Sequence, residues 1–208
     1  YAATIILFII ILTYSQIIAQ EIASEKGTRI MEVILSSTTA QKHFYGKLTG
    51  VLLVALTQMA LYGVILTVGF QQFKHMDFVK SIIENISLDK IIGPFLWYAL
   101  LFMFFGILIF SVLAALCGSL VNKAEDTAKA ILPVTYLSLG GYMLGLILGA
   151  SDPNNIVIRI TSYIPFLSSY IMPIRLANET VGMTSVLISL VVLIIVTFLL
   201  MFFSANMY

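Results

Sequence analysis

The chain has 208 residues, of which 60% are hydrophobic and 10% are charged, whereas soluble domains contain about 45–50% apolar and about 25% charged residues. The single Cys excludes a disulfide scaffold and a zinc ribbon, and the apolar content excludes a disordered tail and a coiled coil. A formal net charge of +1 offers no clustered basic face, so nucleic acid is not expected as a partner. The class that remains is a polytopic helical membrane protein.

Five stretches are apolar and long enough to cross a lipid bilayer. A helix rises about 1.5 Å per residue, so about 20 apolar residues cross the hydrocarbon layer. None of the 11 Lys and Arg or the 10 Asp and Glu residues lies inside a stretch. The strands of a membrane barrel would alternate in polarity, which these stretches do not, so we expect an all-α fold. The sequence predicts one transmembrane domain over 1–208, with spans at about 1–19, 48–70, 95–121, 131–150 and 181–203.

The Lys and Arg residues predict which loops face the cytoplasm. If residue 1 starts outside, segments 20–47, 122–130 and 204–208 are cytoplasmic and carry six Lys and Arg residues. The opposite loops, 71–94 and 151–180, carry five. This small bias predicts a cytoplasmic C-terminus.

The segment 20–47 is long, charged and still patterned. Its apolar residues fall near helical spacing and its charged residues take the other positions, which predicts an amphipathic helix broken or loosened at Gly27. Thr38, with Gln41 three residues later, fits a capping box, so a second helix should start there and run into the next span. The result would be a helix-turn-helix elbow at the membrane surface. The alternative is a solvated linker.

The loops on the opposite side are expected to form short helices. Apolar residues among the charges of 71–94 predict an interfacial helix, and Pro94 suits the first turn of the third span. Pro165 and Pro173 interrupt the apolar stretch 156–176. We therefore expect short broken helices that dip into the membrane and return, rather than a sixth crossing.

No group of residues suits catalysis or metal binding. His43 and His75 lie in loops predicted on opposite sides, so they cannot share a metal or one catalytic triad. Cys117 is a lone thiol in an apolar helix and is interpreted as packing. The stretch around Gly46 and Lys47 lacks the first glycine and the final Ser or Thr of a phosphate-binding loop. Because the predicted spans hold no charged residue, uphill transport would need energy from another subunit, although sodium coupling through backbone carbonyls stays open.

Small and polar residues within the spans have two interpretations each. A four-residue glycine repeat makes one face of the fourth span smooth enough for close helix packing, with a sliding or dimerising face as the alternative. These glycines are Gly141, Gly145 and Gly149. Three polar residues of the first two spans either line a translocation path or only form hydrogen bonds between helices. They are Gln16, Thr57 and Gln58.

Three blocks of sequence stand in a characteristic order along the chain. The first, residues 25–54, reads EKGTRIMEVILSSTTAQKHFYGKLTGVLLV. The second, residues 122–133, reads NKAEDTAKAILP, and the third, residues 162–177, reads SYIPFLSSYIMPIRLA. Together they resemble the elbow, the short cytoplasmic loop and the external proline segment of type-2 ABC exporter permeases, close to the sodium-export branch. Where relatives often have Ser-Pro after the IPF stretch, this chain has Ser168 and Ser169.

The resemblance implies a six-span permease of the bacterial plasma membrane, embedded as a multi-pass protein in the lipid bilayer. This chain would hold the second to sixth spans, and the apolar run that begins at Tyr1 without a basic flank fits a chain cut from a longer one. The family's elbow docks in a groove of a separate ABC ATPase subunit, which binds ATP and Mg²⁺, so no cofactor is expected in this chain. Two permease chains, identical or different, would work with two ATPases.

The expected function is therefore ATP-driven export. The alternatives are a secondary carrier or channel, a membrane-bound enzyme and a non-transporting scaffold. Carried onto this sequence, the ATPase contact falls on the charged residues of the elbow, which are Glu25, Lys26, Arg29 and Glu32, with Ile30, Val33 and Ile34 facing the bilayer or the bundle. A secondary cytoplasmic contact falls on Lys123, Glu125 and Asp126. The external gate would include Pro165, Phe166 and Pro173.

Overall fold

The computed structural model of the protein describes residues 2–28, 30–73 and 94–207. All regular secondary structure within these ranges is helical. The helices are α1 (Ala2–Gly27), α2 (Ile30–Leu35), α3 (Ala40–Phe73), α6 (Pro94–Ser119), α7 (Thr127–Ala130), α8 (Leu132–Ser151), α9 (Ile156–Thr161), α10 (Pro165–Ala177) and α11 (Met183–Met207), with a 3-10 turn, η1 (Ala124–Asp126), before α7. In these ranges α1, α3, α6, the run from η1 to α8, and α11 are long and apolar enough to cross a membrane. The all-α polytopic prediction is confirmed.

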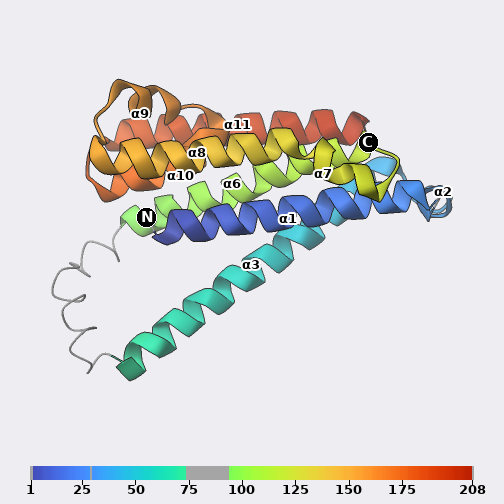
Figure 1. Ribbon diagram of the computed structural model, residues 1–208, viewed down its shortest axis with the longest axis horizontal. Helices are drawn as coiled ribbons and strands as arrows, with labels where there is room; N and C mark the ends of the chain where they lie inside the picture. The colour runs from blue at the N-terminus through green and yellow to red at the C-terminus, as the bar shows by residue number, and fades with distance from the viewer. Residues whose placement is uncertain (1, 29, 74–93, 208) are drawn as a thin grey trace.

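Helix α6 forms the centre of the bundle. It packs against α1 on one side and against α10 and α11 on the others (Figure 1). More of its span is buried than of any other candidate span, and Phe102, Ile109 and Phe110 are fully buried. A helix that is apolar on all sides suits this central position, because every side meets another helix or lipid.

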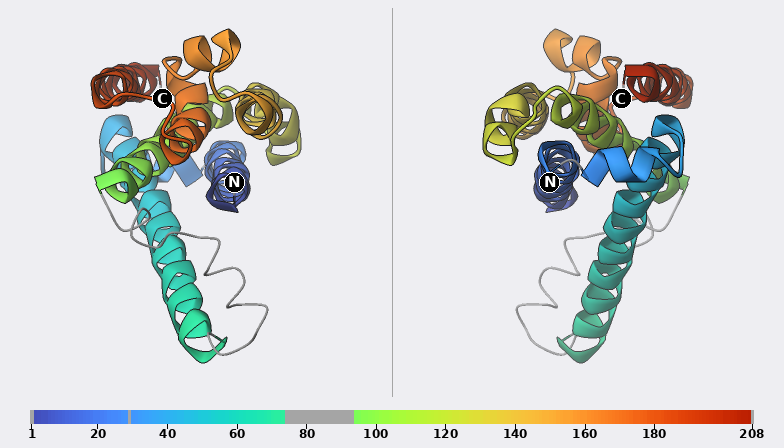
Figure 2. Two further views of the ribbon diagram at one scale, coloured as in Figure 1. Left: turned by 90° about the vertical axis from the view of Figure 1, so that its left-hand side faces the viewer. Right: turned by 90° about the vertical axis from the view of Figure 1, so that its right-hand side faces the viewer.

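Helix α3 leaves the bundle at an angle. Near its start, Phe44 and Leu48 are buried where the helix passes α1 and α11. Further along, its side chains become exposed, including Leu61 at 56% and Ile65 at 58%. Figure 2 shows the second half of α3 projecting away from the other helices. These apolar side chains face the surroundings of the chain, which suits lipid or another protein.

The loops predicted to be cytoplasmic lie together at one end of the bundle. Helix α2, helix α7 and the C-terminus share this end, whereas the N-terminus and α9 lie at the other (Figure 1). This grouping follows from helices that alternate in direction, and the cytoplasmic side assigned from the Lys and Arg bias stays a prediction. The interfacial helix expected in 71–94 falls almost entirely on residues outside the described ranges.

The predicted capping box at the start of α3 is wrong by one residue. The helix begins at Ala40, and the Thr39 hydroxyl, not that of Thr38, accepts a hydrogen bond from the Lys42 backbone N–H at 3.4 Å. The Gln41 side chain does not fold back on the cap. Its amide donates to Oδ1 of Asn206 in α11 at 2.8 Å, so a contact between helices replaces the local one.

The two prolines of the external segment have different effects. Pro165 begins α10, as expected for a residue without a backbone N–H. Pro173, however, lies inside α10 and does not interrupt it. The prediction of a break there is wrong, because buried neighbours on both sides of Pro173 hold the helix together despite the lost backbone hydrogen bond. The break instead lies between α9 and α10, at residues 162–164.

Candidate functional site

A cluster of charged side chains joins α1 to α3 at the elbow. The Lys47 ammonium lies 2.5 Å from Oε1 of Glu25 and 3.4 Å from Oε2 of Glu21. Nε2 of His43 lies 3.4 Å from Oε2 of Glu25. The side chains of Lys47 and Glu25 are only 12% and 22% exposed, so this pair is better shielded from solvent than a surface ion pair. The cluster fixes the end of the first span against the beginning of the second.

The end of α1 is also held to α6 and to the following loop. Nζ of Lys26 donates to the backbone carbonyl of Ser119 at 2.7 Å. A Cβ atom at Gly27 would lie 2.7 Å from the carbonyl oxygen of Asn122, so only glycine allows the two backbones to approach this closely. At Gly118 a Cβ atom would meet the Ala19 backbone at 2.6 Å, so α6 crosses α1 at similarly short range.

Helix α2 carries the part of the elbow that is open to solvent. None of its residues is buried. Glu32 is exposed, and Ile30 and Val33 are exposed by 50% and 71%. Of the four residues expected to meet an ATPase, Glu25 and Lys26 thus bond within the chain, Glu32 faces outward, and Arg29 lies outside the described residues.

The second cytoplasmic candidate lies beside the elbow. Turn η1 begins two residues after Asn122 and packs against the end of α1. Lys123 and Glu125 are exposed, whereas Asp126 is half-buried and lies 3.5 Å from the Lys129 ammonium. The structure therefore brings both predicted cytoplasmic contacts into one surface, formed by the end of α1, by α2 and by η1, which we name the coupling end.

A small polar cluster lies between the first two spans. The Tyr14 hydroxyl donates to Oε1 of Gln58 at 2.5 Å, and the Gln58 amide donates to the hydroxyl of Tyr62. These three residues and Thr57 line a pocket of about 540 Å³. The Thr57 hydroxyl bonds back to the Leu53 carbonyl at 2.7 Å, and Gln16 is exposed and does not line this pocket. The structure therefore unites two of the three path candidates and adds two tyrosines.

Sequence reasoning missed Tyr14 and Tyr62 as polar partners of Gln58. Tyrosine is common in apolar helices, and no local pattern shows which residue of another helix its hydroxyl will meet. The sequence did indicate a hydrogen-bonded site at Gln58, because the amide of a polar side chain within an apolar span needs hydrogen-bond partners there.

Helix α10, which holds the gate candidates, is embedded in the bundle. The Phe166 ring packs edge to face on Phe110 of α6, with ring centroids 5.3 Å apart. Pro165 marks the entry to the helix and Pro173 lies within its last two turns. The Tyr170 hydroxyl shares a 2.5 Å hydrogen bond with the Ser138 hydroxyl of α8.

The glycine repeat of α8 lies against α10. Cβ atoms at Gly141 and Gly145 would come within 2.6 Å of Tyr170 and 2.9 Å of Ile174. At Gly149 the nearest atom, again from Ile174, would be 3.1 Å away. The smooth face of the fourth span is therefore used inside this chain, where it admits the large side chains of α10 at close range.

The described residues hold no group of three or more His, Cys, Asp or Glu side chains able to bind a metal ion. The polar groups instead form an ion cluster between α1 and α3 and a hydrogen-bonded cluster within the spans.

Comparison with known proteins identifies a family and two relatives that this chain resembles. A profile described as ABC-2 family transporter protein matches residues 1–205. The chain is 28% identical over 203 residues to "Uncharacterized protein YhaP" of Bacillus subtilis (strain 168), covering 94% of this chain and 48% of that protein. It is 25% identical over 198 residues to "Uncharacterized protein MJ1024" of Methanocaldococcus jannaschii, covering 94% of this chain and 45% of that protein.

The chain thus spans about half the length of the curated relatives it matches. No solved structure matches it significantly. Because the family profile covers nearly the whole chain and the helices are those of a multi-pass membrane protein, the chain belongs to the ABC-2 transporter family, whose members are membrane components of transporters.

Proposed function

We propose that this chain is the membrane-spanning subunit of an ATP-driven exporter, and that a separate ABC ATPase subunit drives it through the coupling end. The observation that carries the proposal is the ion cluster around Glu25 and Lys47, next to the exposed helix α2. A partner that moves α2 would pull on two spans together, because α1 and α3 are tied at that point.

The distribution of charge supports an external source of energy. The charged residues of α1 and α3 lie at the coupling end, and none of the expected spans contains Asp, Glu, Lys or Arg. Proton-coupled transporters usually keep an ionisable side chain deep in the membrane as a relay. A chain without an ionisable side chain in its spans is suited to be driven by a partner subunit that binds its surface.

The finer points of the proposal follow the resemblance of residues 25–54 to the sodium-export branch. We propose export as the direction, sodium as the first cargo to test, and two permease chains with two ATPase subunits as the working unit. The polar pocket at Tyr14 and Gln58 is the proposed part of the path that lies within this chain.

Transport in vesicles tests the proposal. The protein is reconstituted with and without its ATPase in inside-out vesicles, and sodium uptake is measured with ATP, without ATP and with a non-hydrolysable ATP analogue. We expect uptake only with both the ATPase and ATP. Accumulation by the permease alone would favour a secondary carrier, for which the polar cluster within the membrane is the supporting observation.

The sidedness of the coupling end has its own test. In a Cys117→Ala background, Glu32→Cys places a thiol on exposed α2, and Asp152→Cys places one at the opposite end. We expect a membrane-impermeant maleimide to label the first variant only in inside-out vesicles and the second only in right-side-out vesicles. The reverse pattern would overturn the proposed docking site.

A further inference from the structure

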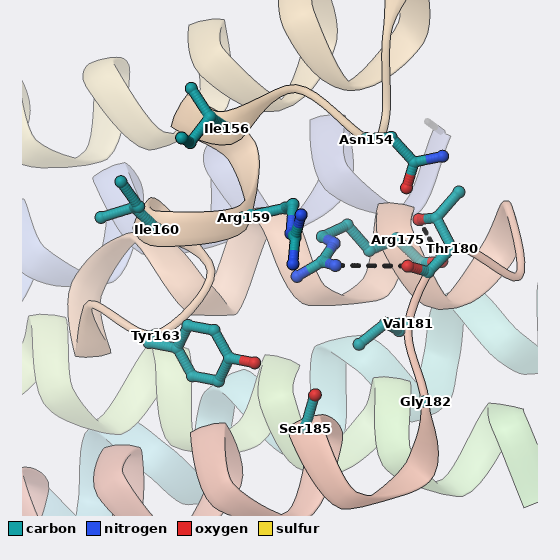
Figure 3. A pocket seen from close by; sticks show the side chains of 10 residues that line it. All are labelled: Asn154, Ile156, Arg159, Ile160, Tyr163, Arg175, Thr180, Val181, Gly182 and Ser185. Atoms are coloured by element: carbon teal, nitrogen blue, oxygen red, sulfur yellow. Dashed lines mark hydrogen bonds between the residues drawn. The ribbon is translucent and has the colours of Figure 1, made fainter.

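A pocket of about 790 Å³ opens at the end of the bundle opposite the coupling end, and two arginines line it. Arg159 comes from α9 and Arg175 from the last turn of α10 (Figure 3). Tyr163, Thr180 and Ser185 complete its polar lining. Two guanidinium groups that face one cavity give that cavity a positive charge.

Arg175 is buried and only partly satisfied. The residue is 5% exposed. One of its terminal nitrogens donates to the Ser162 hydroxyl at 2.7 Å and the other donates to the Thr180 carbonyl at 3.2 Å. Its Nε atom is buried and has no hydrogen-bond partner within the part of the chain that the structure describes. Both acceptors are neutral, so they orient the guanidinium without balancing its charge.

No carboxylate of the described residues forms an ion pair with Arg159 or Arg175. Burial lowers the pKa of the Arg175 guanidinium, nearby Tyr163 raises this pKa, and the charge of Arg159 lowers it. The two arginines are thus close enough to repel each other. A buried charge without a counter-charge is costly, and a bound anion is the usual way to relieve that cost.

The start of α11 adds to the positive field. Gly182 and Ser185 line the pocket, and α11 begins at Met183. The first backbone N–H groups of a helix have no partners within it and carry partial positive charge, which favours an anion nearby.

We propose that this pocket binds a phosphate group, carried either by a phospholipid headgroup or by a free phosphate. Paired guanidinium groups match the geometry of phosphate oxygens, and they hold phosphate through charge-assisted hydrogen bonds. Ile156 and Ile160 of α9 also line the pocket, at its edge, and are 70% and 60% exposed. This apolar edge next to a basic cavity is the combination that an interfacial helix presents to lipid. If the coupling end faces the cytoplasm, as the proposed function has it, this pocket lies at the outer leaflet of the membrane. The proposal that the pocket binds phosphate does not depend on that orientation.

Arg159→Gln is the decisive variant, because its side chain makes no hydrogen bond or ion pair in the described structure and its loss should leave the fold intact. Lys129→Gln removes an exposed charge at the other end of the bundle and is the matched control. Arg175→Lys keeps the buried charge but loses the planar fork of donors.

The protein is purified in a maltoside detergent, which carries no phosphate. Its thermal unfolding is followed against two probes, inorganic phosphate and dihexanoyl phosphatidylglycerol. We expect concentration-dependent stabilisation of the wild type and of Lys129→Gln. Apparent affinity should fall about tenfold or more in Arg159→Gln and in Arg175→Lys, because hydrogen bonds to charged groups are lost.

The two probes distinguish the sources of the phosphate. Stabilisation by the lipid alone assigns the site to a headgroup, and equal stabilisation by inorganic phosphate assigns it to a free phosphate. Absence of stabilisation by either probe in the wild type would overturn the proposal. So would Arg159→Gln binding as tightly as the wild type.

Discussion

Lys47 of α3 and Glu25 of α1 form an ion pair, with Nζ and Oε1 2.5 Å apart, at the point where the chain turns between its first two spans. The exposed helix α2 lies between these two residues in sequence. Under the proposed function, a force applied to α2 would therefore act on both helices of this ion pair, which we name the clamp.

Replacing Lys47 with Gln should loosen the clamp. It leaves Glu25 half-buried without its closest counter-charge, so we expect stability to fall by about 1–3 kcal/mol and coupled transport to fall relative to ATP hydrolysis. Thermal unfolding in detergent and the ratio of transport to hydrolysis measure the two effects. Lys42→Gln removes an exposed charge from the same helix and should change neither. Equal behaviour of the two variants would show that the clamp transmits nothing.

Reversing the charge of Glu32 should affect the ATPase partner and not the fold. The side chain is exposed on α2, so Glu32→Lys should unfold at the wild-type temperature. We expect it to bind the ATPase about tenfold more weakly, as the loss of a charged contact at an interface commonly does. Binding measured in nanodiscs checks this, with Asp152→Lys at the opposite end as control. Wild-type affinity in Glu32→Lys would remove α2 from the docking surface.

Adjacent glycines in α8 should respond in opposite ways to alanine. A Cβ atom at Gly141 would lie 2.6 Å from Cδ2 of Tyr170, whereas one at Gly140 would meet nothing within 4 Å. We expect Gly141→Ala to lose about 1–3 kcal/mol through overpacking. Gly140→Ala should be neutral or gain up to about 1 kcal/mol through helix propensity. Unfolding curves of the two variants in the same detergent decide this, and equal stabilities would contradict the close contact of α8 with α10.

Gln58→Leu tests whether the polar cluster belongs to the transport path. Hydrogen bonds between membrane helices contribute about 0.6 kcal/mol on average, so the stability loss should be small. If the cluster lines the path, transport should fall far more than stability, with the KM for the cargo raised. Thr49→Val is the control, because the Thr49 hydroxyl donates to the Tyr45 carbonyl within the same helix and Thr49 does not line the pocket. A Gln58→Leu variant with full transport would leave the cluster a purely structural role.

The elbow shows how far local patterns reach. α1 ends at Gly27, where the sequence predicts a break, and α3 begins within two residues of the predicted start. Both signals are local, since they depend on glycine and on a threonine that caps the following turn. The choice between Thr38 and Thr39 was not local, because Gln41 bonds to Asn206 on a distant helix.

The same distinction between local signals and distant contacts applies to the candidate site residues. Their presence in loops or spans could be predicted, but their partners could not. Glu25 and Lys26 look like free surface charges in the sequence, yet one meets Lys47 and the other meets the backbone of Ser119. The pairing of Arg159 with Arg175 in one pocket depends on how α9 folds back over α10, and no periodicity indicates that fold.

The sequence by itself determined that this protein is helical, that it crosses the membrane several times and which segments connect the spans. Each apolar segment enters lipid on account of its own composition, and each helix satisfies its own backbone hydrogen bonds. Only the tertiary structure decided which faces meet. In lipid both the buried and the outward faces of a helix are apolar, so the hydrophobic pattern that marks the core of a soluble protein is absent, and steric fit at residues such as Gly118 and Gly141 selects the neighbours instead.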